Sequence, residues 1–122
     1  MDGDTHTQLL AYLRDHVDSS LRGITVYDAD NYDVIYIRED LRAERVRSEV
    51  DQMVERLRQE TRVREQQSFP FGGLNGTLRS FEDAMVMHFP DTQERGTVVT
   101  LEPEVGRDLN MFMHECEKRI NR

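Results

Sequence analysis

Segments with helical periodicity and segments with strand periodicity follow one another in a definite order, and this order constrains the fold of the chain most strongly. Apolar residues spaced three and four positions apart indicate helices, whereas short runs of β-branched and aromatic residues indicate strands. The predicted helices cover residues 6–21 and 41–65 and a final segment that begins at residue 103. The predicted strands cover residues 24–28, 32–38, 77–81, 84–89 and 97–101.

The resulting order, α-β-β-α-β-β-β-α, predicts an α+β domain. Short turns between successive strands favour antiparallel hairpins, and helices then pack against the sheet that these hairpins form. We therefore expect a five-stranded antiparallel sheet with a long central helix and two terminal helices. A chain of 122 residues suits one such domain, residues 1–122, with residues 1–4 as a frayed start.

Capping signals predict where the helices begin and end. Thr5 and Gln8 fit a capping box, and Gly23 fits a left-handed cap after the first helix. Asp40 can cap the central helix, and Pro103 suits the first turn of the last helix.

The second predicted strand has apolar side chains on both faces. Ile35 and Ile37 should lie on one face, and Val34 and Tyr36 on the other. This pattern is expected of a strand that is covered on both faces or whose outer face meets a partner.

The charge of the chain is strongly acidic, with 24 Asp and Glu against 16 Lys and Arg and only one lysine, Lys118. Acidic, arginine-rich surfaces with few lysines favour solubility at high salt, and a GC-rich genome is the alternative explanation for the arginines. A net charge of −8 argues against direct binding to nucleic acid or to anionic membranes. No apolar run approaches the length of a membrane span and no signal-peptide pattern is present, so we expect a cytoplasmic location.

The acidity is unevenly distributed. Residues 38–65 contain eight arginines and eight acids and are therefore neutral, so the excess negative charge lies elsewhere. The central helix is consequently the predicted place for a partner. The candidate interface residues alternate in charge along this helix: Arg45, Glu49, Arg56, Glu60 and Arg64.

The residue types used in catalysis and metal binding are few and form no known motif. A metal site needs several ligands to converge, and the four histidines and one cysteine have no such spacing. Asp28, Asp30 and Asp33 gather at a predicted turn and could associate weakly with cations. Cys116 lies between Phe112 and Ile120 on the apolar stripe of the last helix, which predicts a buried thiol. We therefore expect no cofactor, no metal and no enzymatic activity.

The order and lengths of these elements resemble the roadblock-like and profilin-like families over about residues 6–120. The acidic, lysine-poor composition is similar to that of a small uncharacterised family of salt-loving archaea. The roadblock resemblance implies dimerisation through sheet edges or central helices and a role as a platform for small GTPases or motors. This chain lacks the glycine-rich turns of that family and has a strongly charged central helix, and both departures weaken the expectation of a GTPase partner.

Three functional hypotheses follow. The first is a non-enzymatic protein-interaction, scaffold or regulatory module that forms a homodimer or binds a protein partner. The second is a small-ligand sensor of the profilin or PAS type, with a pocket between sheet and helix. Its candidate lining residues are large and apolar: Tyr36, Met85, Met87, Phe89 and Phe112. The third, an enzyme that uses His88 and Cys116, requires these two residues to meet in space.

Overall fold

The computed structural model of this chain describes residues 2–42, 44–62, 70–91 and 94–120, and it confirms the predicted α+β architecture. The three α-helices of these residues are α1 (Asp2–Val17), α2 (Glu44–Arg62) and α3 (Arg107–Ile120). The five strands are β1 (Leu21–Tyr27), β2 (Tyr32–Ile37), β3 (Thr77–Ser80), β4 (Met85–Pro90) and β5 (Gly96–Leu101). Short 3₁₀ turns lie at Asp18–Ser20, Glu39–Leu41 and Pro103–Gly106.

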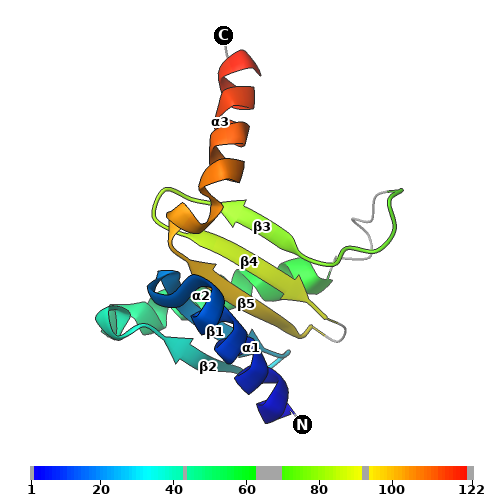
Figure 1. Cartoon of the computed structure of the whole chain (residues 1–122). Coiled ribbons are helices and arrows are strands. Elements are labelled where there is room, and N and C mark those ends of the chain that lie inside the picture. The colour runs from blue at the N-terminus through cyan, green and yellow to red at the C-terminus, as the bar shows by residue number, and fades with distance from the viewer. Residues whose placement is uncertain (1, 43, 63–69, 92–93, 121–122) are drawn as a thin grey trace.

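The strands form one antiparallel sheet in the order β2-β1-β5-β4-β3. Helix α1 crosses one face of this sheet and α2 lies against the other, whereas α3 projects away from the sheet beyond the end of β5 (Figure 1). Two of the three helices therefore form layers with the sheet, and the third does not.

Each covered face of the sheet has its own apolar core. On the α1 side, Leu13 packs with Ile24, Val99 and Leu101 of the central strands. On the α2 side, the core is formed by four buried side chains: Tyr27, Val54, Leu57 and Val98. The alternation of side chains along β1 and β5 supplies both cores, because successive residues of a strand face opposite sides.

The first helix differs from its predicted bounds at both ends. Helix α1 begins at Asp2, so Thr5 lies inside the helix and the predicted capping box does not start it. Residues 2–4 belong to this helix. Gly23 lies within β1 and does not cap α1, because β1 pairs with β5 from Leu21 onwards. A Cβ at Gly23 would lie 3.2 Å from the carbonyl oxygen of Tyr36, so the close approach of β2 explains this glycine.

The central helix also begins later than predicted. Asp40 lies in the 3₁₀ turn Glu39–Leu41, where its carboxylate accepts hydrogen bonds from Arg38, and α2 starts only at Glu44. The pairing with Arg38 occupies the side chain that we expected to cap the helix. The predicted extension to residue 65 lies outside the described residues, which end at Arg62 in this region.

The strand with apolar residues on both faces, β2, is an edge strand with an irregular register. Ile24 is opposite Tyr36 whereas Thr25 is opposite Val34, so Ile35 is an extra residue in the pairing with β1. Ile35 and Tyr36 both pack against the core on the α1 side. The simple alternation predicted from sequence was therefore wrong, because the bulge changes which face each side chain reaches.

Candidate interaction surface

Helix α3 carries an apolar stripe that no part of the described chain covers. Spacings of three and four residues place the members of this stripe along one side of the helix: Leu109, Phe112, Met113, Cys116 and Ile120. Phe112 is 67% exposed and Ile120 is 77% exposed, and no residue of α3 is buried. An amphipathic helix normally buries its apolar side, so this stripe is a candidate contact surface.

A groove lies on the α1 side of the sheet, between α1 and β3. Its volume is about 670 Å³. Tyr12 and His16 of α1 form one wall, and Leu78 of β3 belongs to the other, with Met85 and Met87 of β4 among the lining residues. Leu78 is 44% exposed, because α1 covers the central strands and leaves the β3 side of this face open.

The root of α3 closes one end of this groove. Val105 and Gly106 of the preceding 3₁₀ turn line it, together with Leu109 in the first turn of α3. A Cβ at Gly106 would overlap the side chain of Met85, so glycine permits this turn to lie directly on β4. The rest of α3 continues away from the sheet (Figure 1).

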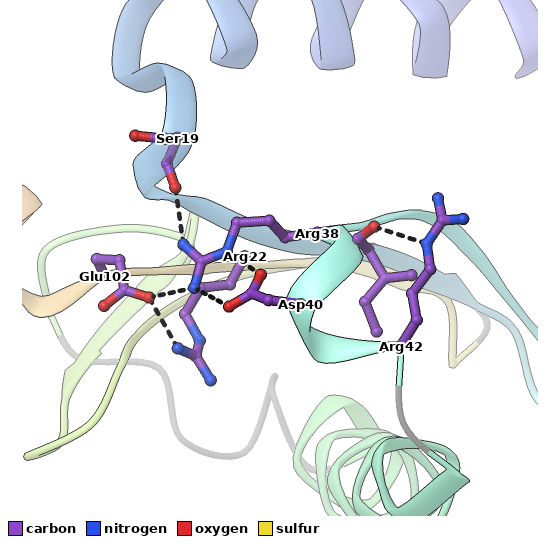
Figure 2. Close-up of polar contacts among 7 residues, drawn as sticks. Ser19, Arg22, Arg38, Asp40, Arg42 and Glu102 are labelled. Atoms are coloured by element: carbon purple, nitrogen blue, oxygen red, sulfur yellow. Dashed lines mark hydrogen bonds and ion pairs between the residues drawn. The ribbon is translucent and has the colours of Figure 1, made fainter.

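Ion pairs around Glu102 hold the chain where it leaves β5. One carboxylate oxygen of Glu102 accepts hydrogen bonds from Arg22 at 2.8 Å and from Arg38 at 2.9 Å (Figure 2). Arg38 also donates to the carbonyl oxygen of Ser19 at 2.7 Å and to Asp40. The hydrogen bonds from Arg22 and Arg38 hold the pKa of the Glu102 carboxyl below its usual value. This cluster ties β5 to the end of β2 and to the turn after α1.

Part of the predicted charged interface is exposed on α2. Glu49 and Arg56 are exposed on α2. Glu60 forms an ion pair with Arg79 of β3, and this contact connects α2 with the sheet. Arg64 and the side chain of Arg45 lie outside the described part of the chain.

Arg58 of α2, which is not one of the predicted interface residues, has a structural role. Arg58 donates hydrogen bonds to the carbonyl oxygens of Asp28 at 2.7 Å and Asn31 at 3.0 Å. These bonds connect α2 with the turn between β1 and β2. The arginines of α2 therefore divide between exposed positions such as Arg56 and positions such as Arg58 that stabilise the fold.

A family model for a domain of unknown function, DUF7522, matches residues 7–121, which is nearly the whole chain. The chain belongs to the DUF7522 family. A comparison of this DUF7522 domain with curated proteins finds no match.

The five residues predicted to line a ligand pocket do not all meet in the DUF7522 domain. Tyr36, Met85 and Met87 pack in or against the core on the α1 side. Phe89 is exposed on β4, and Phe112 lies on the projecting α3. Met85 and Met87 instead form part of the groove floor.

A smaller pocket lies on the opposite face, between the sheet and α2. It has a volume of about 240 Å³, and its lining includes Val34 of β2 and Val50 and Met53 of α2, with Arg22 and Glu49 among the polar residues. This volume is below the roughly 300–1,000 Å³ of typical sites for drug-sized ligands.

His88 and Cys116, the pair proposed for an enzyme, lie in different surroundings. His88 is buried in the sheet, where its Nε2 lies 2.6 Å from the phenol oxygen of Tyr27. Cys116 is an exposed free thiol on α3, so the predicted burial of this residue was wrong. The stripe that suggested a core position is real, but the helix carrying it does not pack on the sheet.

The acidic turn between β1 and β2 is organised by its own backbone. Asp28 accepts hydrogen bonds from the backbone N–H groups of Asp30 and Asn31, at 2.9 and 2.8 Å, and these bonds lower the pKa of its carboxyl. Among the described residues, no group of three or more His, Cys, Asp or Glu side chains is placed to hold a metal ion. In the same part of the chain, no helix has the length and apolar character of a membrane span.

The exposed stripe and the open groove are the features that sequence reasoning missed. The periodicity of residues 105–120 does reveal an apolar side, but an amphipathic pattern does not tell whether that side meets the same chain or another one. The charge pattern directed attention to α2, whereas it is α3 that carries an exposed apolar stripe.

Proposed function

We propose that this domain is a non-enzymatic protein-interaction module with a scaffold or regulatory role, and that it acts as a dimer. The exposed apolar stripe of α3 is the observation that carries the proposal. A helix that projects from a folded domain with its apolar side uncovered is suited to contact another protein surface. The partner is a protein, with no direct contact to nucleic acid and no membrane attachment.

We further propose that the domain works in a high-salt cytoplasm and has a roadblock-like relationship within a family of salt-loving archaea. The net charge of −8 and the single lysine support the first part. The order of elements and the five-stranded antiparallel sheet support the second. Surface contacts made by such a protein should rely on apolar burial, since molar salt screens exposed charges.

The test is co-purification of tagged protein from native extract in molar salt. Phe112→Asp places a charge on the stripe. Met111→Asp is the matched control, because Met111 is also exposed but lies about 100° from Phe112 on the side of the helix away from the rest of the stripe. Proteins that bind the unmodified domain and the control, but not Phe112→Asp, would support a role for the stripe. An identical set of bound proteins with all three would contradict it.

The pocket between the sheet and α2 favours a second candidate function, that of a small-ligand sensor. Its lining combines apolar side chains with Arg22 and Glu49, so it suits a small apolar molecule with one polar group. A thermal-shift screen with small aromatic carboxylic acids tests this function. The sensor role requires a ligand that raises the Tm of the unmodified domain but not that of Val50→Trp, which fills the pocket.

A further inference from the structure

We propose that a second copy of this chain occupies the groove, with α3 of each copy lying between α1 and β3 of the other. This inference rests on the proposed interaction function and specifies its partner. It differs from the roadblock-like dimers implied by the resemblance, which join through sheet edges or central helices. The contact here is an exchange of terminal helices.

The groove and the stripe are neighbours along the chain but do not cover each other within one copy. Val105, Gly106 and Leu109 belong to the groove lining, whereas Phe112, Met113 and Ile120 lie farther along α3. Helix α3 leaves the sheet after its first turn (Figure 1). Each copy therefore presents an apolar helix and an apolar groove at the same time.

The root of α3 is held in place by contacts that favour this projecting arrangement. Gly106 packs against Met85 with no room for a side chain, and the Glu102 cluster anchors the preceding end of β5. Asn110 donates a hydrogen bond to the carbonyl oxygen of Pro103 at 3.3 Å, which joins the first turn of α3 to its root. The helix is thus directed outwards from a well-packed base.

The exposed apolar area is sufficient for a stable dimer. Eight large apolar side chains on the stripe, its root and the same face of the sheet are more than a third exposed: Tyr12, Leu78, Phe89, Val105, Leu109, Phe112, Met113 and Ile120. A large side chain presents roughly 150–250 Å² when fully accessible, and these eight are on average about half exposed, so together they present about 600–1,000 Å² on each copy. Specific protein interfaces bury about 800 Å² per partner.

A two-fold pair satisfies both copies at once. Because every copy carries one helix and one groove, a symmetric exchange makes two identical contacts and leaves neither apolar surface uncovered. If each copy instead placed its helix in the groove of a different copy, an open chain of copies would form, with an uncovered helix at one end and an uncovered groove at the other. Symmetry therefore favours a second copy over an unrelated partner with a similar helix.

The net charge predicts how this dimer responds to salt. Each copy carries −8, so two copies repel one another at low ionic strength, and salt screens that repulsion. We expect the dimer Kd to fall as salt rises. An interface made from the paired charges of α2 would show the opposite trend.

Sedimentation equilibrium in molar salt provides the first test. The unmodified chain should sediment as a dimer, and Phe112→Asp should raise the dimer Kd about tenfold or more because it places a carboxylate in an apolar contact. Met111→Asp should change the Kd no more than about twofold. Circular dichroism of each variant verifies that the domain remains folded.

Disulfide trapping then locates the contact. One chain carries Leu78→Cys with Cys116→Ser, so that its only cysteine is at position 78. This chain is mixed either with the unmodified chain, which keeps Cys116, or with a chain that carries Met113→Cys and Cys116→Ser. Each mixture is then oxidised. Helix exchange predicts cross-linked heterodimers between position 78 of one copy and α3 of the other. The matched control replaces Leu78→Cys with Glu82→Cys, in the exposed turn between β3 and β4, and should trap far less.

Three outcomes would overturn the exchange. If the chain stays monomeric at all concentrations in molar salt, a second copy does not occupy the groove. Co-purification from native extract then still shows whether the domain binds other proteins. Links only between Cys116 of one copy and Cys116 of another indicate paired α3 helices without the groove. A link within a single chain that carries Leu78→Cys and native Cys116 indicates that α3 closes on its own groove.

Discussion

The phenol oxygen of Tyr27 lies 2.6 Å from Nε2 of His88, and both side chains are buried. The two rings lie close to parallel, with their centroids 5.9 Å apart. The same phenol oxygen lies 3.4 Å from the carbonyl oxygen of Leu57 in α2. The contacts of Tyr27 therefore connect β1 with β4 and with α2. The phenol has one proton. Either Nε2 of a neutral imidazole accepts it, or an Nε2–H group donates to the phenol oxygen, which then donates to the carbonyl oxygen of Leu57.

Acidification should destabilise the fold through His88. Burial lowers the pKa of His88 below its usual value of about 6.5, so the unfolded chain binds this proton more readily than the folded one. The contribution of neutral His88 to the free energy of unfolding is therefore fully present above pH 6.5. It falls as the pH drops towards the folded pKa, by at most about 1.4 kcal/mol per pH unit. Chemical denaturation between pH 7.5 and 5 measures this slope.

Replacement of single histidines separates this effect from general acid sensitivity. His88→Gln should lower stability at pH 7.5 but flatten the slope between pH 6.5 and 5. His114→Gln, at an exposed position on α3, is the matched control and should retain the full slope. An unchanged slope in His88→Gln would contradict the assignment.

Gly96→Ala should destabilise the domain through Tyr27. A Cβ at Gly96 would lie 2.5 Å from the phenol oxygen of Tyr27 and 2.7 Å from the adjacent ring carbon, so the buried ring would have to move. Overpacking of this kind costs about 1–3 kcal/mol. Gly73→Ala is the control, because nothing lies within 4 Å of a Cβ there. Urea denaturation compares the two, and equal losses would count against the contact with Tyr27.

Glu102→Gln should weaken the root of α3, most strongly at low salt. The change removes the charge that Arg22 and Arg38 share, and about 1 kcal/mol is the expected loss for a cluster that is one-quarter exposed. Because the pKa of the Glu102 carboxyl is lowered, its contribution is present above the usual value of about 4.5 and disappears as the pH falls below it.

Denaturation of Glu102→Gln at low and at molar salt measures that loss, which should shrink as salt screens the charges. Glu82→Gln, at an exposed position between β3 and β4, should have little effect in either condition. A loss for Glu102→Gln that is independent of salt would instead indicate that the hydrogen bonds matter more than the charge.

Cys116 should react with an alkylating reagent at a rate that depends on protein concentration. The thiol is exposed in a single copy, so a dilute sample should be modified readily. If α3 exchanges between copies, the stripe becomes covered and the rate should drop above the dimer Kd. In Phe112→Asp, Cys116 should remain reactive both below and above the dimer Kd. Mass spectrometry of timed samples measures the alkylation rate of the dilute chain, the concentrated chain and this variant. A rate that never changes with concentration would argue against a covered stripe.

Local patterns explain why so much of the fold could be predicted. The periodicities near residues 9–17, 46–57 and 109–120 arise from the repeat of the helix itself, and the β-branched runs arise from the geometry of strands. Both are properties of adjacent residues, so the element order and the α+β class were confirmed. The boundary predicted at Gly23 was wrong because pairing with the distant strand β5 decided it, and the cap predicted at Asp40 was wrong because this side chain pairs with Arg38 in a 3₁₀ turn before the helix.

At the candidate interaction surface, the features that the sequence determines are distinct from those that the tertiary structure determines. The sequence alone determined that α3 has an apolar stripe from Leu109 to Ile120, that the excess charge lies outside residues 38–65, and that no familiar catalytic motif is present. Only the tertiary structure decided that this stripe stays uncovered, that Cys116 is exposed and that a groove lies beside the root of the helix. Amphipathicity is a property of one helix, whereas burial depends on where the rest of the chain places it.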